Sequence, residues 1–449
     1  MDSLVKNGPY MNKLLLNALY LQSSMYSDWD SSFFDNQESN SKGLVFYERF
    51  KSLLPNYIDK PTIPTTVALL TCGACLVPYG YQSAGWVLSG MAYQMIVDLG
   101  CHLDSPAASK PAAIEQEMKK RIYWGAFVSD KFQSLFLGRP VTMHESTGNV
   151  RHEYLDSFEE MEEWTPYVDS FTQPGDSSVQ PYRGRPARAI STFQSLLQLS
   201  KIATQIIQAF YSGGSQRSSE LVLLQIKSDV TGQLGYWRDN LPLWLLFDPS
   251  VDTTPPPHQI TPHALYWTLV ILTEQAFLNR GRFNFTLDPD AAEASRKLCI
   301  KAALSIWRLV EAYKRVFTLR RAQYGISYAT YCAALVMLQH TSHESNEYGE
   351  CIQFLWTALS EYQKGTCYGL KRPLKLLKSL MRRLGSVNAG SEADEPVLIW
   401  PTPSTASNPR LDPDANRHLE SELWDVSTLG NIPDDIFLAD DSIFGMFGG

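Results

Sequence analysis

The sequence has no excess of positive charge, no long apolar run and no secretory leader. Its 449 residues carry 39 Lys and Arg against 47 Asp and Glu, a formal net charge of −8, so composition alone gives no reason to expect phosphate binding. The longest apolar runs, Ala264–Leu272 and Ala333–Leu338, are far shorter than the roughly 20 residues that span a bilayer. The N-terminus lacks a basic n-region and a convincing cleavage site. We therefore expect an intracellular protein that does not enter a membrane.

The signatures of common enzyme classes are also missing. The sequence contains no GxSxG, no GxGxxG and no GxxxxGK[ST] motif. Two HExxH-like segments have Gly148 and Glu347 where the second histidine belongs, so a zinc ion would lack two facing imidazoles. In Asp434–Leu438, a leucine replaces the third acid of the DDxxD pattern that binds Mg²⁺ and diphosphate in all-helical enzymes. These absences predict that the protein is not an enzyme.

Cysteines are few and scattered. The seven cysteines are an odd number and lie in apolar segments, which favours a reducing compartment over a disulfide framework. Cys72 and Cys75 form a single CxxC inside the apolar run Leu69–Val77, with no second pair and no nearby histidine to complete a tetrahedral site. We interpret them as small buried side chains and expect no metal or cofactor in this chain.

What the sequence does contain is one helical pattern after another. Leu298 begins a stripe of apolar residues that recur at three- and four-residue steps as far as Phe317, and Asp288 with Pro289 supplies a helix start. No segment shows sustained period-two alternation, so a sheet core is not expected. We predict an all-α, multi-helix bundle with helices over Leu14–Tyr26, Thr65–Val77, Gly85–Leu99, Ile114–Phe136, Ile190–Tyr211, Ser218–Asn240, Pro262–Arg280, Ala291–Arg321, Tyr328–His340 and Glu347–Lys364.

Three segments interrupt these helices. Ser170–Ala187 and Asp252–His258 are rich in proline and read as surface loops, which a helical bundle tolerates without a domain boundary. Ser386–His418 holds five prolines among Ser, Asn and Ala, which is typical of a flexible linker. We therefore expect a helical regulatory body over residues 1–385, a Pro/Ser-rich linker over 386–418 and a tail over 419–449.

The negative charge is concentrated in that C-terminal part. From Ser386 onward, 12 acids oppose two arginines, so the last 64 residues carry −10 and the body is near neutral. Between Leu419 and Phe447, apolar residues alternate with seven acids and no Lys or Arg. Such a composition favours an acidic activation tail that folds into a partner's groove, and the alternative is a solvated tail with a few residues docked back on the bundle. The apolar residues concerned are Trp424, Ile436, Phe437, Leu438, Phe444 and Phe447.

A basic amphipathic segment precedes the linker. Lys371–Leu384 combines six bases with leucines at helical spacing. It fits the last helix of the bundle with its long basic side chains in water, a nuclear-import patch, or a helix that lies on a membrane surface.

Two further segments carry paired motifs. Ala84–Asp104 is a Trp-containing helical pattern that leads into L-G-x-H-x-D, and Glu117–Pro140 contains R-x-Y-W-x-x-F-x-x-D followed by G-R-P. At this spacing they resemble the fungal-specific transcription factor domain, the helical middle homology region of zinc-cluster regulators. The resemblance covers roughly Leu14–Leu384, and Asp156–Tyr167 is similar to the nitrate-assimilation regulator subgroup.

The resemblance implies a set of family motif residues, which we interpret as mainly structural. Aromatic residues within three helical turns can pack while the charged ends bond between helices, and a glycine followed by Arg-Pro ends the helix. The alternative is an effector or partner site that uses Arg139 or the His102/Asp104 corner. The motif residues are Trp86, Gly100, His102, Asp104, Arg121, Trp124, Asp130, Gly138, Arg139 and Pro140.

One departure from the family pattern bears on function. Members of this family begin with six cysteines that hold two zinc ions and read DNA, and no CxxCxxxxxxC occurs in this sequence. Either the sequence is truncated or the protein regulates without binding DNA itself. DNA would then be reached only through the missing module or through a partner.

These observations lead to one hypothesis and one alternative. The resemblance and the tail favour a nuclear transcriptional regulator of a metabolic or biosynthetic gene set, whose body binds an effector or a partner and forms a homo- or heterodimer. Its tail would recruit the transcription machinery or a co-activator. The alternative is a DNA-independent co-regulator that heterodimerises with intact zinc-cluster factors.

Overall fold

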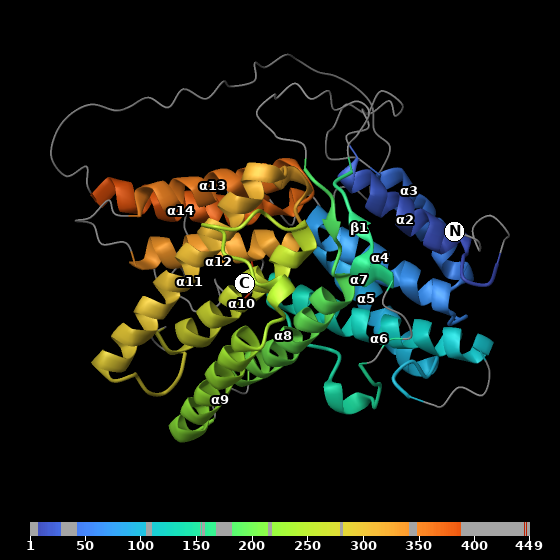
Figure 1. The fold of residues 1–449 in the computed structure, drawn as a ribbon, viewed down its shortest axis with the longest axis horizontal. Helices are drawn as coiled ribbons and strands as arrows, with labels where there is room; N and C mark the ends of the chain where they lie inside the picture. The colour runs from blue at the N-terminus through green and yellow to red at the C-terminus, as the bar shows by residue number, and fades with distance from the viewer. Residues whose placement is uncertain are drawn as a thin grey trace, which may run out of the picture.

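The computed structural model describes residues 8–27, 43–104, 110–152, 154, 158–167, 182–213, 218–278, 282–340, 348–387, 444 and 446. These residues form helices and one small antiparallel sheet of β1 (Glu163–Trp164) and β2 (Arg185–Pro186), so the predicted all-α fold is confirmed (Figure 1). The helices are α2 (Lys13–Tyr26), α3 (Leu44–Leu53), α4 (Ile63–Tyr79), α5 (Gln82–Asp98), α6 (Lys110–Leu137), α7 (Phe158–Met161), α8 (Ala189–Phe210), α9 (Glu220–Asp239), α10 (Pro257–Leu278), α11 (Pro289–Val316), α12 (Tyr324–His340), α13 (Gly349–Lys364) and α14 (Lys371–Val387).

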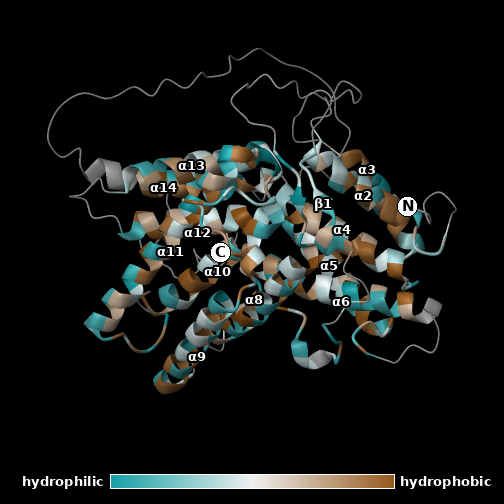
Figure 2. Cartoon of the chain, viewed as in Figure 1, coloured by the Kyte–Doolittle hydropathy of each residue, from teal (hydrophilic) through white to brown (hydrophobic). Residues whose placement is uncertain are grey.

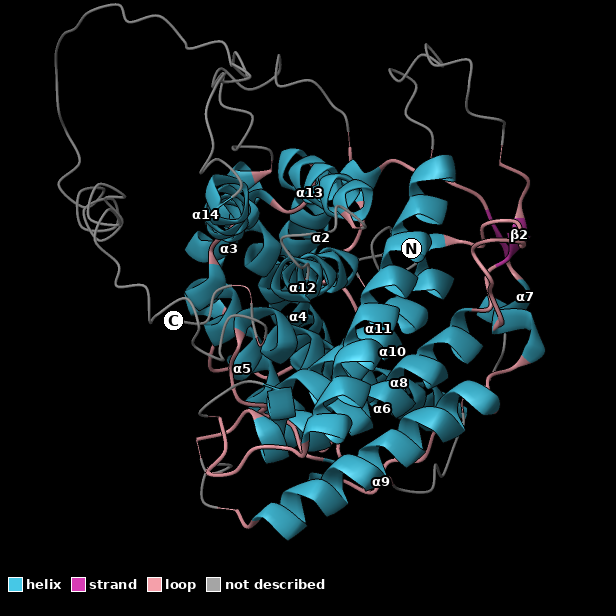
Figure 3. Ribbon diagram, turned by 90° about the vertical axis from the view of Figure 1, so that its left-hand side faces the viewer, coloured by secondary structure: helices cyan, strands magenta, loops and turns pink. Residues whose placement is uncertain are grey.

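Two helices that are buried on almost every side form the centre of the larger core. Every residue of α12 from Ile326 to Leu338 is buried, and α10 is buried along most of its length. A helix without a polar face has to be covered on every side, and here α10 packs against α8, α11 and α12, while α12 also packs against α13 and α14. Figure 2 shows the apolar residues of α10, and Figure 3 places α12 near the middle of the molecule.

A second core lies among the N-terminal helices. α2 packs on α3 and α4, and α4 packs closely on α5. The two helices approach closely at Gly73 and Gly85, where a Cβ on Gly85 would lie 2.7 Å from the Gly73 carbonyl oxygen, so only glycine fits. α6 contacts α4 and α5 as well as α8 and α12, and it therefore joins the two cores (Figure 1).

Most predicted helices are present with ends shifted by a few residues. The predicted start at Asp288 is confirmed, because its carboxylate accepts a hydrogen bond from the Asp290 N–H at 3.2 Å. The continuous helix to Arg321 was wrong: α11 ends at Val316, Phe317 is extended, and Leu319–Arg321 forms a separate 3-10 helix.

Two details of the pattern analysis were also wrong. Leu298 does not belong to the buried stripe, since it is 40% exposed while Cys299 beside it is fully buried. Helix α3 was not predicted because its sequence, LVFYERFKSL, is short and has few buried residues.

The end of the predicted loop Ser170–Ala187 contributes β2, which pairs with β1 through Glu163–Pro186 and Trp164–Arg185.

The basic segment forms α14, which packs on α12 and α13. Leu377 is buried, whereas Lys371, Arg372, Lys375 and Lys378 are exposed. The first of the three interpretations, a bundle helix with a wet basic face, is confirmed, and the nuclear-import patch stays a prediction. Across the part of the chain that the structure describes, no helix has both the length and the apolar character needed to cross a membrane.

Candidate functional site

The L-G-x-H-x-D motif forms a corner at the end of α5. Gly100 has φ of +66°, a left-handed conformation that ends the helix. The His102 carbonyl accepts the N–H of Asn149 at 3.1 Å, and the Asn149 side chain accepts the N–H of Asp104 at 2.8 Å. The Asp104 carboxylate also pairs with Arg151, whose hydrogen bond lowers the pKa of Asp104. These contacts hold the corner against the loop that follows α6.

Arg121 and Trp124 fix the same loop from α6. The Arg121 guanidinium donates to Glu117 at 2.8 Å and to Glu159 at 2.5 Å, so it joins α6 to α7. The Trp124 indole N–H donates to the carbonyl oxygen of Arg151 at 3.2 Å. The polar groups of both side chains therefore form hydrogen bonds within the body.

Asp130 and Lys131 form an ion pair that is almost inaccessible to solvent. Their side chains are 0% and 1% exposed and lie 2.7 Å apart. The Asp130 carboxylate also accepts the N–H groups of Thr142 at 3.1 Å and of Met143 at 2.9 Å, and the Lys131 ammonium donates to the Met143 carbonyl. Burial lowers the pKa of Lys131, and the adjacent Asp130 opposes that shift.

The G-R-P motif ends α6. Gly138 has φ of +67°, and the N–H of Arg139 bonds back to the Ser134 carbonyl at 3.1 Å. The Ser134 hydroxyl donates to the Pro140 carbonyl at 3.3 Å. The Arg139 guanidinium lies 5.4 Å from the ring centre of Trp86 on α5, so the motif joins the ends of two helices.

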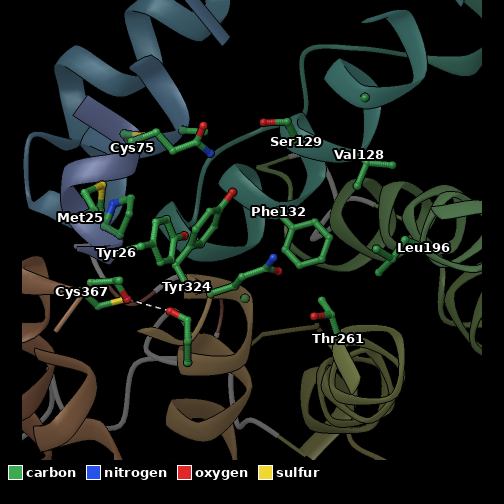
Figure 4. Close-up of a pocket in the computed structure, with 18 residues that line it drawn as sticks. Met25, Tyr26, Cys75, Val128, Ser129, Phe132, Leu196, Thr261, Tyr324 and Cys367 are labelled. Atoms are coloured by element: carbon green, nitrogen blue, oxygen red, sulfur yellow. Dashed lines mark hydrogen bonds between the residues drawn. The ribbon is translucent and has the colours of Figure 1, made fainter. Parts of the chain in front are cut away.

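A cavity of about 290 Å³ lies where α2, α4, α6, α8, α10 and α12 meet. In Figure 4 the rings of Tyr26 and Tyr324 lie side by side, with Cys75 and Cys367 near them and Phe132 and Ser129 contributed by α6. None of the ten motif residues is among the described residues that line this cavity.

The cavity has a mostly apolar lining that also carries polar, uncharged groups. Among the described residues, its lining includes phenols, thiols, hydroxyls and the amides of Gln22 and Gln323, with no acidic or basic side chain. Burial raises the pKa of the Cys75 thiol to about 12 and that of Cys367 to about 11, so neither is a thiolate nucleophile near neutral pH. Burial also raises the pKa of Tyr324. Such a lining offers hydroxyl and amide groups for hydrogen bonds and no side chain that could serve as a counter-ion for a charged ligand.

This cavity was not predicted from the sequence. The prediction that Cys72 and Cys75 are buried is confirmed, and Cys75 in addition faces the cavity. One available signal was the pair Gly125 and Ser129, small residues one helical turn apart in the aromatic-rich part of α6. The sequence did not show which helices lie opposite that face.

Two residues of the predicted tail lie in the core of the body. Phe444 is 6% exposed and stacks on Tyr211, with ring centres 4.7 Å apart and planes inclined by 25°. Met446 is 5% exposed, and its N–H donates to the Phe136 carbonyl at 2.9 Å. At these positions the docked alternative is confirmed. The other tail residues singled out from the sequence, Trp424, Ile436, Phe437, Leu438 and Phe447, lie outside the described residues.

The fold and the site thus define an all-helical domain with a cavity where six of its helices meet. The chain belongs to the family described as "Fungal specific transcription factor domain", whose model matches residues 4–239, slightly more than half of the sequence. The matched range contains both motif segments and ends well before Leu384, the limit expected from the resemblance.

Curated relatives align over more of the chain. The chain is 30% identical over 320 residues to the nitrogen assimilation transcription factor nit-4 of Neurospora crassa. The alignment covers 70% of this chain and 27% of that protein. The chain is 26% identical over 337 residues to the nitrogen assimilation transcription factor nirA of Emericella nidulans, covering 74% of this chain and 35% of that protein. The transcriptional activator protein acu-15 of Neurospora crassa is 22% identical over 406 residues, and the alignment covers 88% of this chain and 41% of that protein. The chain therefore spans less than half the length of these relatives. No solved structure matches it.

Proposed function

We propose that this chain is the regulatory portion of a fungal transcriptional regulator, and that the genes it controls belong to nitrogen metabolism. The observation that carries the proposal is the similarity to two nitrogen assimilation transcription factors over about 70% of the chain. The similarity to nit-4 and nirA also supports the resemblance of Asp156–Tyr167 to that subgroup.

In this proposal the body binds an effector, and the tail binds the proteins that start transcription. The cavity between α2, α6 and α12 takes a small uncharged effector, and residues 419–449 recruit the transcription machinery or a co-activator. The ten motif residues act as a scaffold, which agrees with their contacts between α5, α6 and the following loop. The protein acts in the nucleus as a homo- or heterodimer, and it reaches DNA through a zinc-cluster module or a partner.

The tail is tested by fusing residues 419–447 to a heterologous DNA-binding domain. We expect reporter activation, and we expect replacement of Phe437 and Leu438 by alanine to reduce it, because acidic activation segments bind partners through apolar side chains. The matched control is a fusion of the linker 386–418, which has five prolines, no phenylalanine and a single apolar run, Val397–Trp400. An expressed fusion without reporter activity would contradict this part of the proposal.

The cavity is tested with the full chain by thermal denaturation in the presence of small nitrogen compounds. We expect stabilisation by an uncharged amide or urea-type compound and none by nitrate or ammonium, because an ion in this lining would lack a counter-charge. Val128→Phe fills part of the cavity and should abolish the stabilisation, whereas Val87→Phe on the exposed side of α5 should leave it unchanged.

Capture experiments separate the proposal from its alternative. If the chain pulls down an intact zinc-cluster factor and activates no reporter as a DNA-bound fusion, the co-regulator function would replace the one proposed here.

A further inference from the structure

We infer that the ends of α6 and α8 form a docking groove for a short apolar peptide, that the chain's own Phe444 and Met446 occupy it, and that docking withholds this part of the tail from partners. The docking groove is defined by Phe136, Tyr211 and the side chains packed around them. The last part of this inference, that docking keeps the tail from partners, rests on the proposed function of the tail.

The end of α6 supplies a hydrogen-bond acceptor at this groove. The last carbonyls of a helix have no partner in the next turn, and Gly138 turns the chain away directly after Leu137. The Phe136 carbonyl accepts the Met446 N–H at 2.9 Å instead. The docked residue thus pairs with a backbone acceptor that any peptide could use, while its side chain is buried to 5% exposure.

The body holds Tyr211 in place for stacking. Its hydroxyl donates to the Leu272 carbonyl on α10 at 2.7 Å, and the Arg282 guanidinium lies 4.8 Å from its ring centre. Arg282 is itself fixed by donating to the Phe210 carbonyl at 2.8 Å. A ring fixed in this way loses little conformational freedom when Phe444 stacks on it, so the groove is organised for an aromatic side chain.

The occupant combines apolar contact with an acidic context. Phe444 and Met446 follow Asp440 and Asp441, and the segment from Leu419 to Phe447 contains no Lys or Arg. Aromatic residues flanked by acids are also what an activation segment offers to a co-activator. Phe444 cannot stack on Tyr211 and enter a partner's groove at the same time, so docking and recruitment compete.

Docking is tested by hydrogen exchange on the full chain, followed by mass spectrometry of peptides that contain Met446. We expect the Met446 amide to exchange much more slowly than an unstructured amide, and Phe444→Ala to speed it by at least about tenfold, because the aromatic contact that holds the segment is lost. The matched control, Phe437→Ala, should leave it unchanged. If the Met446 amide of the unmodified protein exchanges as fast as an unstructured amide, the docking is wrong.

The body side is tested with two substitutions at Tyr211. Tyr211→Phe keeps the ring and should keep the protection of Met446, whereas Tyr211→Leu removes the stacking partner and should abolish it. Helical circular dichroism and the unfolding midpoint show whether each variant is folded. If Tyr211→Leu does not fold, Phe444→Ala still decides the question, because the groove itself is then untouched.

The withholding is tested by fusing the full chain to a heterologous DNA-binding domain. Tyr211→Leu should raise reporter output several-fold over the unmodified chain and over Tyr211→Phe. If exchange shows release and the isolated 419–447 fusion is active, but Tyr211→Leu leaves the output unchanged, the withholding is wrong. If the isolated tail is inactive, the proposed function fails while the docking result stands on the exchange data.

Discussion

Phe136 packs edge-on against Tyr324, with ring centres 5.1 Å apart and planes inclined by 77°. Tyr324 lines the cavity, and the carbonyl of Phe136 accepts the Met446 N–H of the docked tail. One aromatic pair therefore separates the candidate effector site from the tail's docking groove. A ligand that moves Tyr324 would have to repack Phe136, because protein interiors are close-packed and do not deform freely.

The first prediction concerns Phe136 itself. Phe136→Ala should lower the free energy of unfolding by about 3–5 kcal/mol, since the ring is 1% exposed and its removal leaves a void between α6 and α12. Urea denaturation measures the change. Val87→Ala on α5, where the side chain is 59% exposed, should stay within about 0.5 kcal/mol. Equal effects would show that Phe136 is not part of the packed core.

The buried ion pair gives the second prediction. Asp130→Ala should cost about 3–5 kcal/mol in urea denaturation, because it leaves the Lys131 ammonium buried without its carboxylate. Adding Lys131→Met should recover much of the loss, since the unpaired charge is then gone. For comparison, Glu293→Ala, which breaks an exposed pair with Arg296, should have no measurable effect. A double variant as unstable as Asp130→Ala would contradict this account.

Two glycines give a third prediction with opposite signs. A Cβ at Gly148 would lie 2.6 Å from the His102 carbonyl oxygen and 2.8 Å from the Tyr123 hydroxyl, so Gly148→Ala should destabilise the protein by about 1–3 kcal/mol. A Cβ at Gly90 inside α5 meets nothing within 4 Å, and Gly90→Ala should add about 0.4–1 kcal/mol. Thermal unfolding of the two variants measures both changes. A Gly148→Ala variant that is more stable than Gly90→Ala would show that the corner at His102 packs differently.

Two partly buried histidines predict how stability depends on pH. Burial lowers the pKa of His258 and of His263, whose Nε2–H donates to the Leu245 carbonyl at 2.9 Å. Below the ordinary value of 6.5, the unfolded chain then binds protons that the folded chain does not, so stability should fall as the pH drops through this window. Urea denaturation at pH 7.5 and 5.5 measures the slope. His263→Gln should flatten it, and the same variant at pH 7.5, where the imidazole is neutral, provides the baseline.

The fifth prediction concerns nuclear import. Replacing Lys371, Arg372, Lys375 and Lys378 on the exposed face of α14 by glutamine should shift a fluorescent fusion of the full chain from the nucleus to the cytoplasm. The protein should stay folded, because Leu377 and its apolar neighbours are unchanged. The matched control replaces Lys297, Lys301 and Arg308, which are exposed on α11. Nuclear accumulation of both variants would assign import to another segment.

The local helical patterns of this protein are encoded in short stretches of its sequence. Asp288 and Pro289 start α11 as predicted, and Gly100 and Gly138 end α5 and α6, because capping and left-handed turns depend on neighbouring residues only. The burial of Cys72 and Cys75 followed from the apolar run around them. The missing period-two alternation likewise excluded a sheet core.

The tertiary structure alone decided where the cavity lies and where the tip of the tail docks. Tyr26, Cys75, Tyr324 and Cys367 are distant in sequence, and only the packing of their helices encloses a cavity between them. Composition left the tail's two interpretations open, because an acidic segment with aromatic residues suits both a partner and the chain's own core. The stacking of Phe444 on Tyr211 shows that the tip docks on the core, and this contact can form only once α8 has packed against α6 and α10.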